Sequence, residues 1–250
     1  MKHRAYSSWI FMLVLLFPLM VSCETRVVGG TAKDYFGDTK EALLARAAAE
    51  GNVATVKQLV QQGANANAVG DKNMSPLGWA LAAKSVTGMR ALLDAGADPN
   101  QPIGPEHEIH LVWLAAGLES SDTLRVLLSY RGNPDAKHDG LSFNAMRRAV
   151  MHPNNMRLLV EAGADVNADD GLGFGVALIA ANLAQFEVVD YLLEHGYRRD
   201  LPLLAWAVGN RDVSESFRPK KQKTMEILRS MGFSASQGKP PKMEGITPLP

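Results

Sequence analysis

The sequence contains one cysteine, Cys23, and its 26 basic residues equal its 26 acidic residues. A formal net charge of zero removes the electrostatic case for binding nucleic acid, which requires a basic surface. Because neither a second cysteine nor a G-x-S-x-G motif is present, covalent catalysis has no visible nucleophile. The composition therefore gives no positive sign of an enzyme and points to a soluble interaction protein.

The N-terminal apolar run is too short to cross a bilayer. It extends from Trp9 to Val21, thirteen residues, whereas a hydrocarbon core about 30 Å thick needs about 20. Lys2 and Arg4 precede the run, and small residues follow it. This order of basic, apolar and small residues predicts a secretory signal over residues 1–22.

The residues that end this segment resemble a bacterial lipoprotein processing site. Leu19-Met20-Val21-Ser22-Cys23 places a small residue before the cysteine, although Met20 departs from the usual Leu, Val or Ile. The resemblance implies that Cys23 is lipidated and that the lipid consumes the only thiol. Because Glu24 follows where Asp would mark inner-membrane retention, the resemblance favours the periplasmic side of the outer membrane. A cleaved protein without lipid and an uncleaved anchor remain alternatives.

The rest of the chain is built on a repeated ending. Leu92-Leu93-Asp94-Ala95-Gly96-Ala97-Asp98-Pro99-Asn100 has near-copies along most of the sequence. The pattern predicts a helix end, a left-handed glycine and an Asp or Asn turn. The marking glycines are separated by 33, 36, 31 and 33 residues: Gly63, Gly96, Gly132, Gly163 and Gly196.

A period near 33 residues with this ending resembles the ankyrin repeat. Ser75-Pro76-Leu77-Gly78-Trp79-Ala80 stands where that family has T-P-L-H-x-A, with Gly78 in place of the histidine. The other openings are more degenerate. The resemblance implies an all-α ankyrin-repeat solenoid of about five repeats plus a C-terminal cap over residues 38–233. We expect residues 23–37 to form a lipid-anchored tether and residues 234–250 to form a disordered Pro-rich tail.

Three further clusters have a composition that could serve a ligand or a surface. His107-Glu108-Ile109-His110 has metal-like composition but not the H-E-x-x-H spacing, so we predict neither a metal nor a cofactor. Gly171, Gly173 and Gly175 lack the preceding strand of a dinucleotide loop and predict a mobile turn. The lysines from Lys220 to Lys223 predict a solvated loop, with contact to anionic lipid heads as the alternative.

Stacked repeats expose a broad surface formed by finger loops and first helices, so partner binding is predicted there. Core packing is the alternative for the tryptophans Trp79, Trp113 and Trp206. The candidate partner-binding residues are the aromatic, charged and apolar residues at those positions: Met74, Trp79, His107, His110, Trp113, Phe143, Arg147, Asp169, Asp170, Leu172 and Phe174.

The architecture resembles that of immunity proteins of the type VI secretion system, which neutralise antibacterial effectors such as phospholipases. The resemblance implies a periplasmic, lipid-anchored protein whose partner is a toxic effector. A periplasmic scaffold or stress-protection module is the alternative, and an enzyme of unrecognised type is a third reading.

Overall fold

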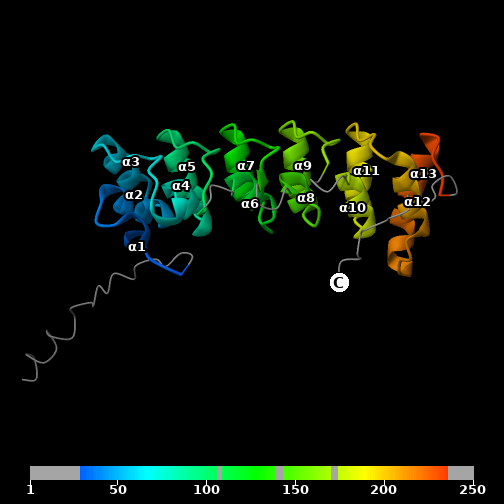
Figure 1. Cartoon of the computed structure of the whole chain (residues 1–250), viewed down its shortest axis with the longest axis horizontal. Helices are drawn as coiled ribbons and strands as arrows, with labels where there is room; N and C mark the ends of the chain where they lie inside the picture. Colours follow the sequence, from blue (N-terminus) through cyan, green and yellow to red (C-terminus); the bar gives the residue numbers. More distant parts are fainter. Residues whose placement is uncertain (1–28, 106–108, 139–142, 170–173, 236–250) are drawn as a thin grey trace, which may run out of the picture.

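The computed structural model describes residues 29–105, 109–138, 143–169 and 174–235. They form six helical hairpins stacked side by side in a single row (Figure 1). We call the first helix of each hairpin inner and the second outer. The inner helices are α2 (Lys40–Ala49), α4 (Pro76–Ala82), α6 (Leu111–Ala116), α8 (Ala145–Arg148), α10 (Val176–Asn182) and α12 (Leu201–Asn210). The outer helices are α3 (Val53–Gln61), α5 (Val86–Asp94), α7 (Asp122–Ser129), α9 (Pro153–Glu161), α11 (Phe186–Glu194) and α13 (Arg218–Ser230).

Shorter elements lie between and before the hairpins. The described residues place the helix α1 (Ala32–Phe36) before the first hairpin and the strands β1 (Lys137–His138) and β2 (Phe143–Asn144) before α8. Two 3₁₀ turns complete the set, η1 (Asp71–Asn73) and η2 (Glu215–Phe217). The fold is therefore predominantly helical, as the sequence predicts.

Polar side chains begin several of the helices. Thr39 accepts a hydrogen bond from the N–H of Ala42, Ser75 accepts one from Gly78, and Asn144 accepts one from Arg147. Each bond satisfies a backbone donor that the first helical turn leaves without a partner. Local sequence thus fixes where these inner helices start.

A residue in the left-handed conformation follows each outer helix. After the third outer helix this residue is Arg131 (φ 65°). The prediction that Gly132 takes the left-handed conformation there is therefore wrong by one residue. Gly132 instead donates its N–H to Leu127 O at 2.9 Å, as Ala97 donates to Leu92 O. Gly132 is small because a Cβ there would lie 2.7 Å from Val112 Cγ2. The residues in the left-handed conformation are Gly63, Gly96, Arg131, Gly163, Gly196 and Gly232.

A ladder of asparagine side chains joins successive hairpins. The side-chain amide of Asn67 donates to Gly96 O at 2.9 Å, while its Oδ1 accepts from the N–H of Asp98 at 2.7 Å. Asn100 and Asn167 make the same pair of bonds to the next unit. These bonds lock neighbouring units in register because each asparagine holds two backbone groups at once.

The core runs along the row between inner and outer helices. It consists mainly of leucine, valine and alanine, and small residues let helices approach closely. Gly88 on α5 shows how tight one contact is, since a Cβ there would lie 1.7 Å from Ala48 O. The core is therefore spread along an array and does not form one globule.

The first end of the array is closed by α1. Tyr35 and Phe36 pack against Trp79, which is fully buried. The ring centroid of Trp79 lies 5.1 Å from that of Tyr35 and 6.5 Å from that of Phe36. Thr31 begins α1 with a capping box. Residues 31–37 of the predicted tether are thus folded, because two aromatic side chains bury themselves against α4.

The last end is closed by α13, which corrects the prediction of a solvated loop at Lys220 to Lys223. Lys220 pairs with Glu187 at 3.1 Å, and Lys223 pairs with the buried Asp190 at 3.0 Å. The hydrogen bond that Lys223 donates to Asp190 raises the pKa of Lys223 above its usual value. Lys221 donates to the carbonyl oxygens of Gly209 and Arg211 at the end of α12. A charged outer face here keeps the final apolar layer covered.

Candidate functional site: the finger and inner-helix surface

The loops that precede the inner helices are the fingers, and the third and fourth are joined to each other. Ile103 bridges Ile109 within the third finger, and Ile109 bridges His138 of the fourth. β1 and β2 then pair antiparallel, with His138 opposite Phe143. Backbone pairing therefore holds these two fingers side by side along the edge of α6 and α8.

A stack of three side chains lies between the joined fingers and the inner helices. The ring of Trp113 on α6 meets the ring of His138 edge-on, with centroids 4.8 Å apart. The guanidinium carbon of Arg148 on α8 lies 4.7 Å from the centroid of Trp113. Trp113 is only 6% exposed, whereas Arg148 is exposed, so the arginine forms the outer layer of the stack.

Gly117, one turn after Trp113, makes room for this arginine. A Cβ at Gly117 would lie 2.4 Å from Arg148 Nε and 2.8 Å from its Cγ. The side chain of Arg148 therefore lies flat across the end of α6, with Gly117 beneath it and Trp113 beside it. Such a placement restricts a side chain that would otherwise be flexible.

A second arginine–aromatic pair lies on the same helix. Arg147 lies 4.0 Å from the ring centroid of Phe143, measured from its guanidinium carbon. Asn144, between them in the chain, donates its side-chain amide to Asp169 O at 3.2 Å. That bond ties the fourth finger to the fifth, which is closed by a bridge between Asp169 and Gly175.

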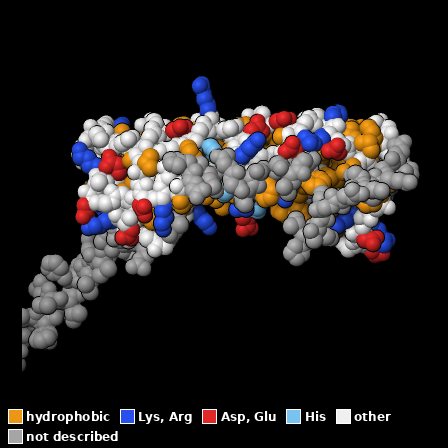
Figure 2. All heavy atoms as spheres, in the orientation of Figure 1, with side chains coloured by type: hydrophobic (Ala, Val, Ile, Leu, Met, Phe, Trp, Pro, Cys, Tyr) orange, Lys and Arg blue, Asp and Glu red, His pale blue; other side chains and the backbone are white. Residues whose placement is uncertain are grey.

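Apolar side chains are exposed on the next part of the array, toward the C-terminus. Figure 2 shows hydrophobic side chains gathered over the α8 and α10 part of the row. Met151, just after α8, is 52% exposed, and Leu183, just after α10, is 45% exposed. Ile179 on α10 is half-buried. Exposed apolar side chains next to positioned arginines are typical of binding surfaces.

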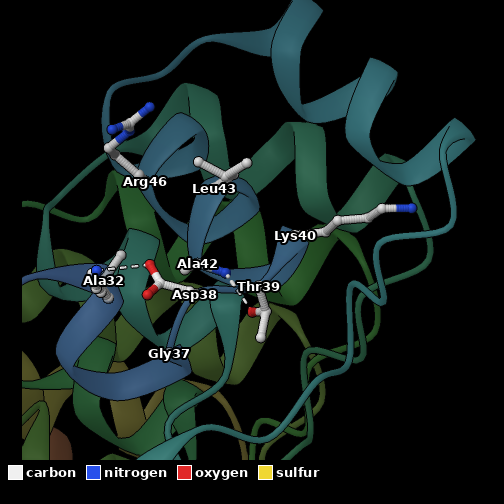
Figure 3. A pocket seen from close by; sticks show the side chains of 9 residues that line it. Ala32, Gly37, Asp38, Thr39, Lys40, Ala42, Leu43 and Arg46 are labelled. Atoms are coloured by element: carbon white, nitrogen blue, oxygen red, sulfur yellow. Dashed lines mark hydrogen bonds and ion pairs between the residues drawn. The ribbon is translucent and has the colours of Figure 1, made fainter.

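Two hollows lie at the ends of the array, away from this surface. One of about 440 Å³ is lined by α1 and α2 and includes Leu43, Arg46 and the Lys33–Asp38 ion pair of 2.8 Å (Figure 3). Another of about 410 Å³ is lined by residues of the last hairpin, including Arg211 and Arg229. A further hollow of about 400 Å³ lies at the turns between inner and outer helices.

The comparisons with known proteins agree with this architecture. A family model for ankyrin repeats, in three copies, matches residues 16–103. The crystal structure of the human ASB11 ankyrin repeat domain is similar over 80% of this chain and 92% of that chain, with 22% identity and a TM-score of 0.56. The fold is an ankyrin-repeat solenoid. No match was found among curated proteins.

Ankyrin arrays are protein-interaction modules that use the surface of fingers and inner helices. No catalytic family matches this chain. Within the described residues, no group of His, Cys, Asp and Glu side chains could hold a metal ion. A search of the same residues also finds no helix of the length and apolar character that crossing a membrane demands.

The ankyrin array sorts the predicted binding residues into core and surface. Met74 and Trp79 belong to the core, so neither side chain is exposed to a partner, and for Trp79 the structure shows the core-packing alternative. Trp79 is covered because α1 lies over it. Trp113 is also mostly buried, but it supports the exposed Arg148.

The remaining candidates divide between surface and undescribed positions. His110, Phe143, Arg147 and Phe174 are half-buried, and Asp169 is exposed, 3.7 Å from Arg199. Of these, the structure brings Phe143 and Arg147 together with Trp113 around the fourth finger. The other four predicted residues lie outside the described part of the chain: Cys23, His107, Asp170 and Leu172.

Three residues of this surface were missed by the sequence analysis. Arg148, Gly117 and His138 were not selected, although they form one contact with Trp113. The Arg147–Arg148 pair was visible in the sequence, but only the helix register shows that the two arginines stack on different rings. His138 precedes Asp139-Gly140, a turn dipeptide, so the local sequence gives no signal that its ring contacts Trp113.

Proposed function

We propose that this ankyrin array binds a protein partner along the surface formed by the third to fifth fingers and helices α6, α8 and α10. One contrast carries the proposal. At the first end the inner-helix tryptophan Trp79 is covered by α1, whereas in the middle Arg148 and Met151 are exposed. The exposed middle combines positioned arginines with apolar side chains, which is the composition of interface anchors.

The partner in this proposal is a toxic antibacterial effector, such as a type VI phospholipase, and the chain is its immunity protein. The N-terminal sequence supports the location, since Cys23 follows a secretory signal pattern and would carry the lipid. An anchored inhibitor would be held on the periplasmic side of the outer membrane, where an effector that attacks phospholipids acts. The array needs no cofactor for this role, since binding alone blocks an active site.

The proposal is tested by capturing the partner with the full chain, tagged at its C-terminus and expressed in its own periplasm. Mass spectrometry should identify one stoichiometric partner with hydrolase sequence, and adding the purified chain should abolish that partner's activity. Several weak partners, or one whose activity does not change, would contradict immunity. That result would favour a periplasmic scaffold or stress-protection module.

The anchor is tested separately with Cys23→Ser. We expect this variant to lose incorporation of labelled fatty acid and to leave the washed outer-membrane fraction. A serine-to-alanine change at Ser22 serves as a control because it keeps a small residue before the cysteine. Recovery of Cys23→Ser in washed outer membranes would exclude lipidation as the anchor.

A further inference from the structure

We propose that Arg148 is the anchor of the binding surface and that it takes a carboxylate from an acidic segment of the partner protein. This inference rests on the proposed protein-binding function and deepens it by naming the residue and the chemistry of the partner. It starts from the position of Arg148, which is exposed but stacked on Trp113.

The side chain of Arg148 is held in place before any partner arrives. The ring centroid of Trp113 lies 4.7 Å from its guanidinium carbon, and the ring of His138 contacts Trp113 edge-on. Gly117 leaves the space that the arginine stem occupies. Ordering a free arginine side chain costs conformational entropy, and this arrangement removes much of that cost from binding.

The guanidinium keeps its donors available. Within the described residues, Arg148 makes no hydrogen bond and no ion pair, although the array contains many acidic side chains. A guanidinium that stacks through its face still presents its N–H groups along its edge. That edge matches a carboxylate with two parallel hydrogen bonds.

The surroundings favour an acidic protein segment over a lipid head group. Arg148 is the last residue of α8, and its side chain crosses the end of α6 at Gly117. Met151, three residues later in the chain, is exposed. A protein segment can offer a carboxylate to Arg148 and an apolar side chain to Met151 at the same time.

The test measures binding of the purified full chain, in mild detergent, to an array of twelve-residue peptides. Each peptide carries Glu residues among apolar residues, and its matched partner carries Gln at the same positions. We expect the Glu peptides to bind at least about tenfold more tightly than the Gln peptides. Arg148→Ala should remove that preference, and Arg148→Lys should restore only part of it because lysine cannot form the bidentate pair.

Gly117→Ala tests the positioning of Arg148 without removing it. The added methyl should displace the arginine and weaken Glu-peptide binding, while Arg125→Ala on the outer helix α7 serves as a matched arginine control and should change nothing. Circular dichroism melts of every variant identify any loss of fold. An unchanged Glu preference in a folded Arg148→Ala protein, or no Glu preference in the wild type, would overturn the inference. So would Arg148-dependent binding to phosphatidylglycerol vesicles in place of peptides.

The two proposals fail in different ways. If the captured periplasmic partner binds wild type and Arg148→Ala equally well, protein binding stands and the carboxylate anchor is wrong. If the Glu preference depends on Arg148 but no captured effector is inhibited, the anchor stands and the immunity function is wrong.

Discussion

The hydroxyl of Tyr197 occupies the space that a side chain at Gly175 would need. A Cβ at Gly175 would lie 2.0 Å from Tyr197 Oη. Tyr197 follows Gly196 where the second unit has Ala97, and Gly175 begins α10 where Ser75 begins α4. Tyr197 is fully buried, and this burial raises its pKa above the usual value. The fifth unit therefore exchanges a serine–alanine pair for a glycine–tyrosine pair.

This exchange predicts strong coupling between the two positions. Gly175→Ser should destabilise by about 1–3 kcal/mol through overpacking, and Tyr197→Ala by about 3 kcal/mol through the cavity it leaves. The double variant restores the pairing of the second unit, so its loss should be at least about 1 kcal/mol smaller than the sum. Urea unfolding followed by circular dichroism measures all three proteins. Additive losses would show that the close approach has no energetic consequence.

Asp135 interrupts the asparagine ladder and offers a stabilising change. It accepts from the N–H of Asp165 at 2.9 Å, but a carboxylate cannot donate to the carbonyl of Gly163 as an asparagine would. Asp135→Asn should add that bond and stabilise the array by about 0.5–1.5 kcal/mol. The reverse change, Asn67→Asp, should cost a similar amount. Thermal unfolding of both proteins checks the pair, and a lower stability for Asp135→Asn would contradict this account.

Arg131 occupies a backbone conformation that suits glycine better. Its φ of 65° is left-handed, and the corresponding residues in the neighbouring units are Gly96 and Gly163. Arg131→Gly should stabilise the array by up to about 1 kcal/mol, because the Cβ strain disappears. Gly163→Ala is the opposite change and should destabilise by about the same amount. Equal unfolding midpoints for Arg131→Gly and wild type would show that the strain is already offset.

Glu41 makes the stability of the first unit sensitive to acid. The N–H of Asn65 donates to its carboxylate at 3.1 Å, and this hydrogen bond lowers the pKa of Glu41 from 4.5. Its stabilising contribution is complete above pH 4.5 and is lost as the pH falls through the lowered folded-state pKa. Glu41→Gln should therefore lose less stability than wild type on going from pH 6 to about pH 3. The urea unfolding midpoints of wild type and Glu41→Gln, measured across that pH range, test this difference.

Glu119→Gln is the control for this experiment. Glu119 is exposed and makes no hydrogen bond or ion pair among the described residues. Its replacement should leave the acid profile of the wild type unchanged. A profile for Glu41→Gln that also matches wild type would mean that the Asn65 bond contributes nothing in solution.

The sequence by itself determined the repeated hairpins, because its signals act over a few residues. Serine, threonine and asparagine caps such as Ser75 bond the first turn of their own helix, and a glycine such as Gly96 relieves strain at one backbone position. The same local signals misplaced the third ending at Gly132. There the decisive facts were the contact with Val112 and the left-handed Arg131, and neither can be read from a local pattern.

Only the tertiary structure decided which side chains form the surface. Trp79 and Trp113 both lie on inner helices, yet one is sealed by α1 and the other supports an exposed arginine. The difference arises because the burial of a side chain depends on which other elements pack over it. Trp79 is covered by residues of α1, which lies far from it in the sequence. Arg148 became a candidate for the same reason, since Gly117 and Trp113 belong to the preceding unit and only stacking brings them together.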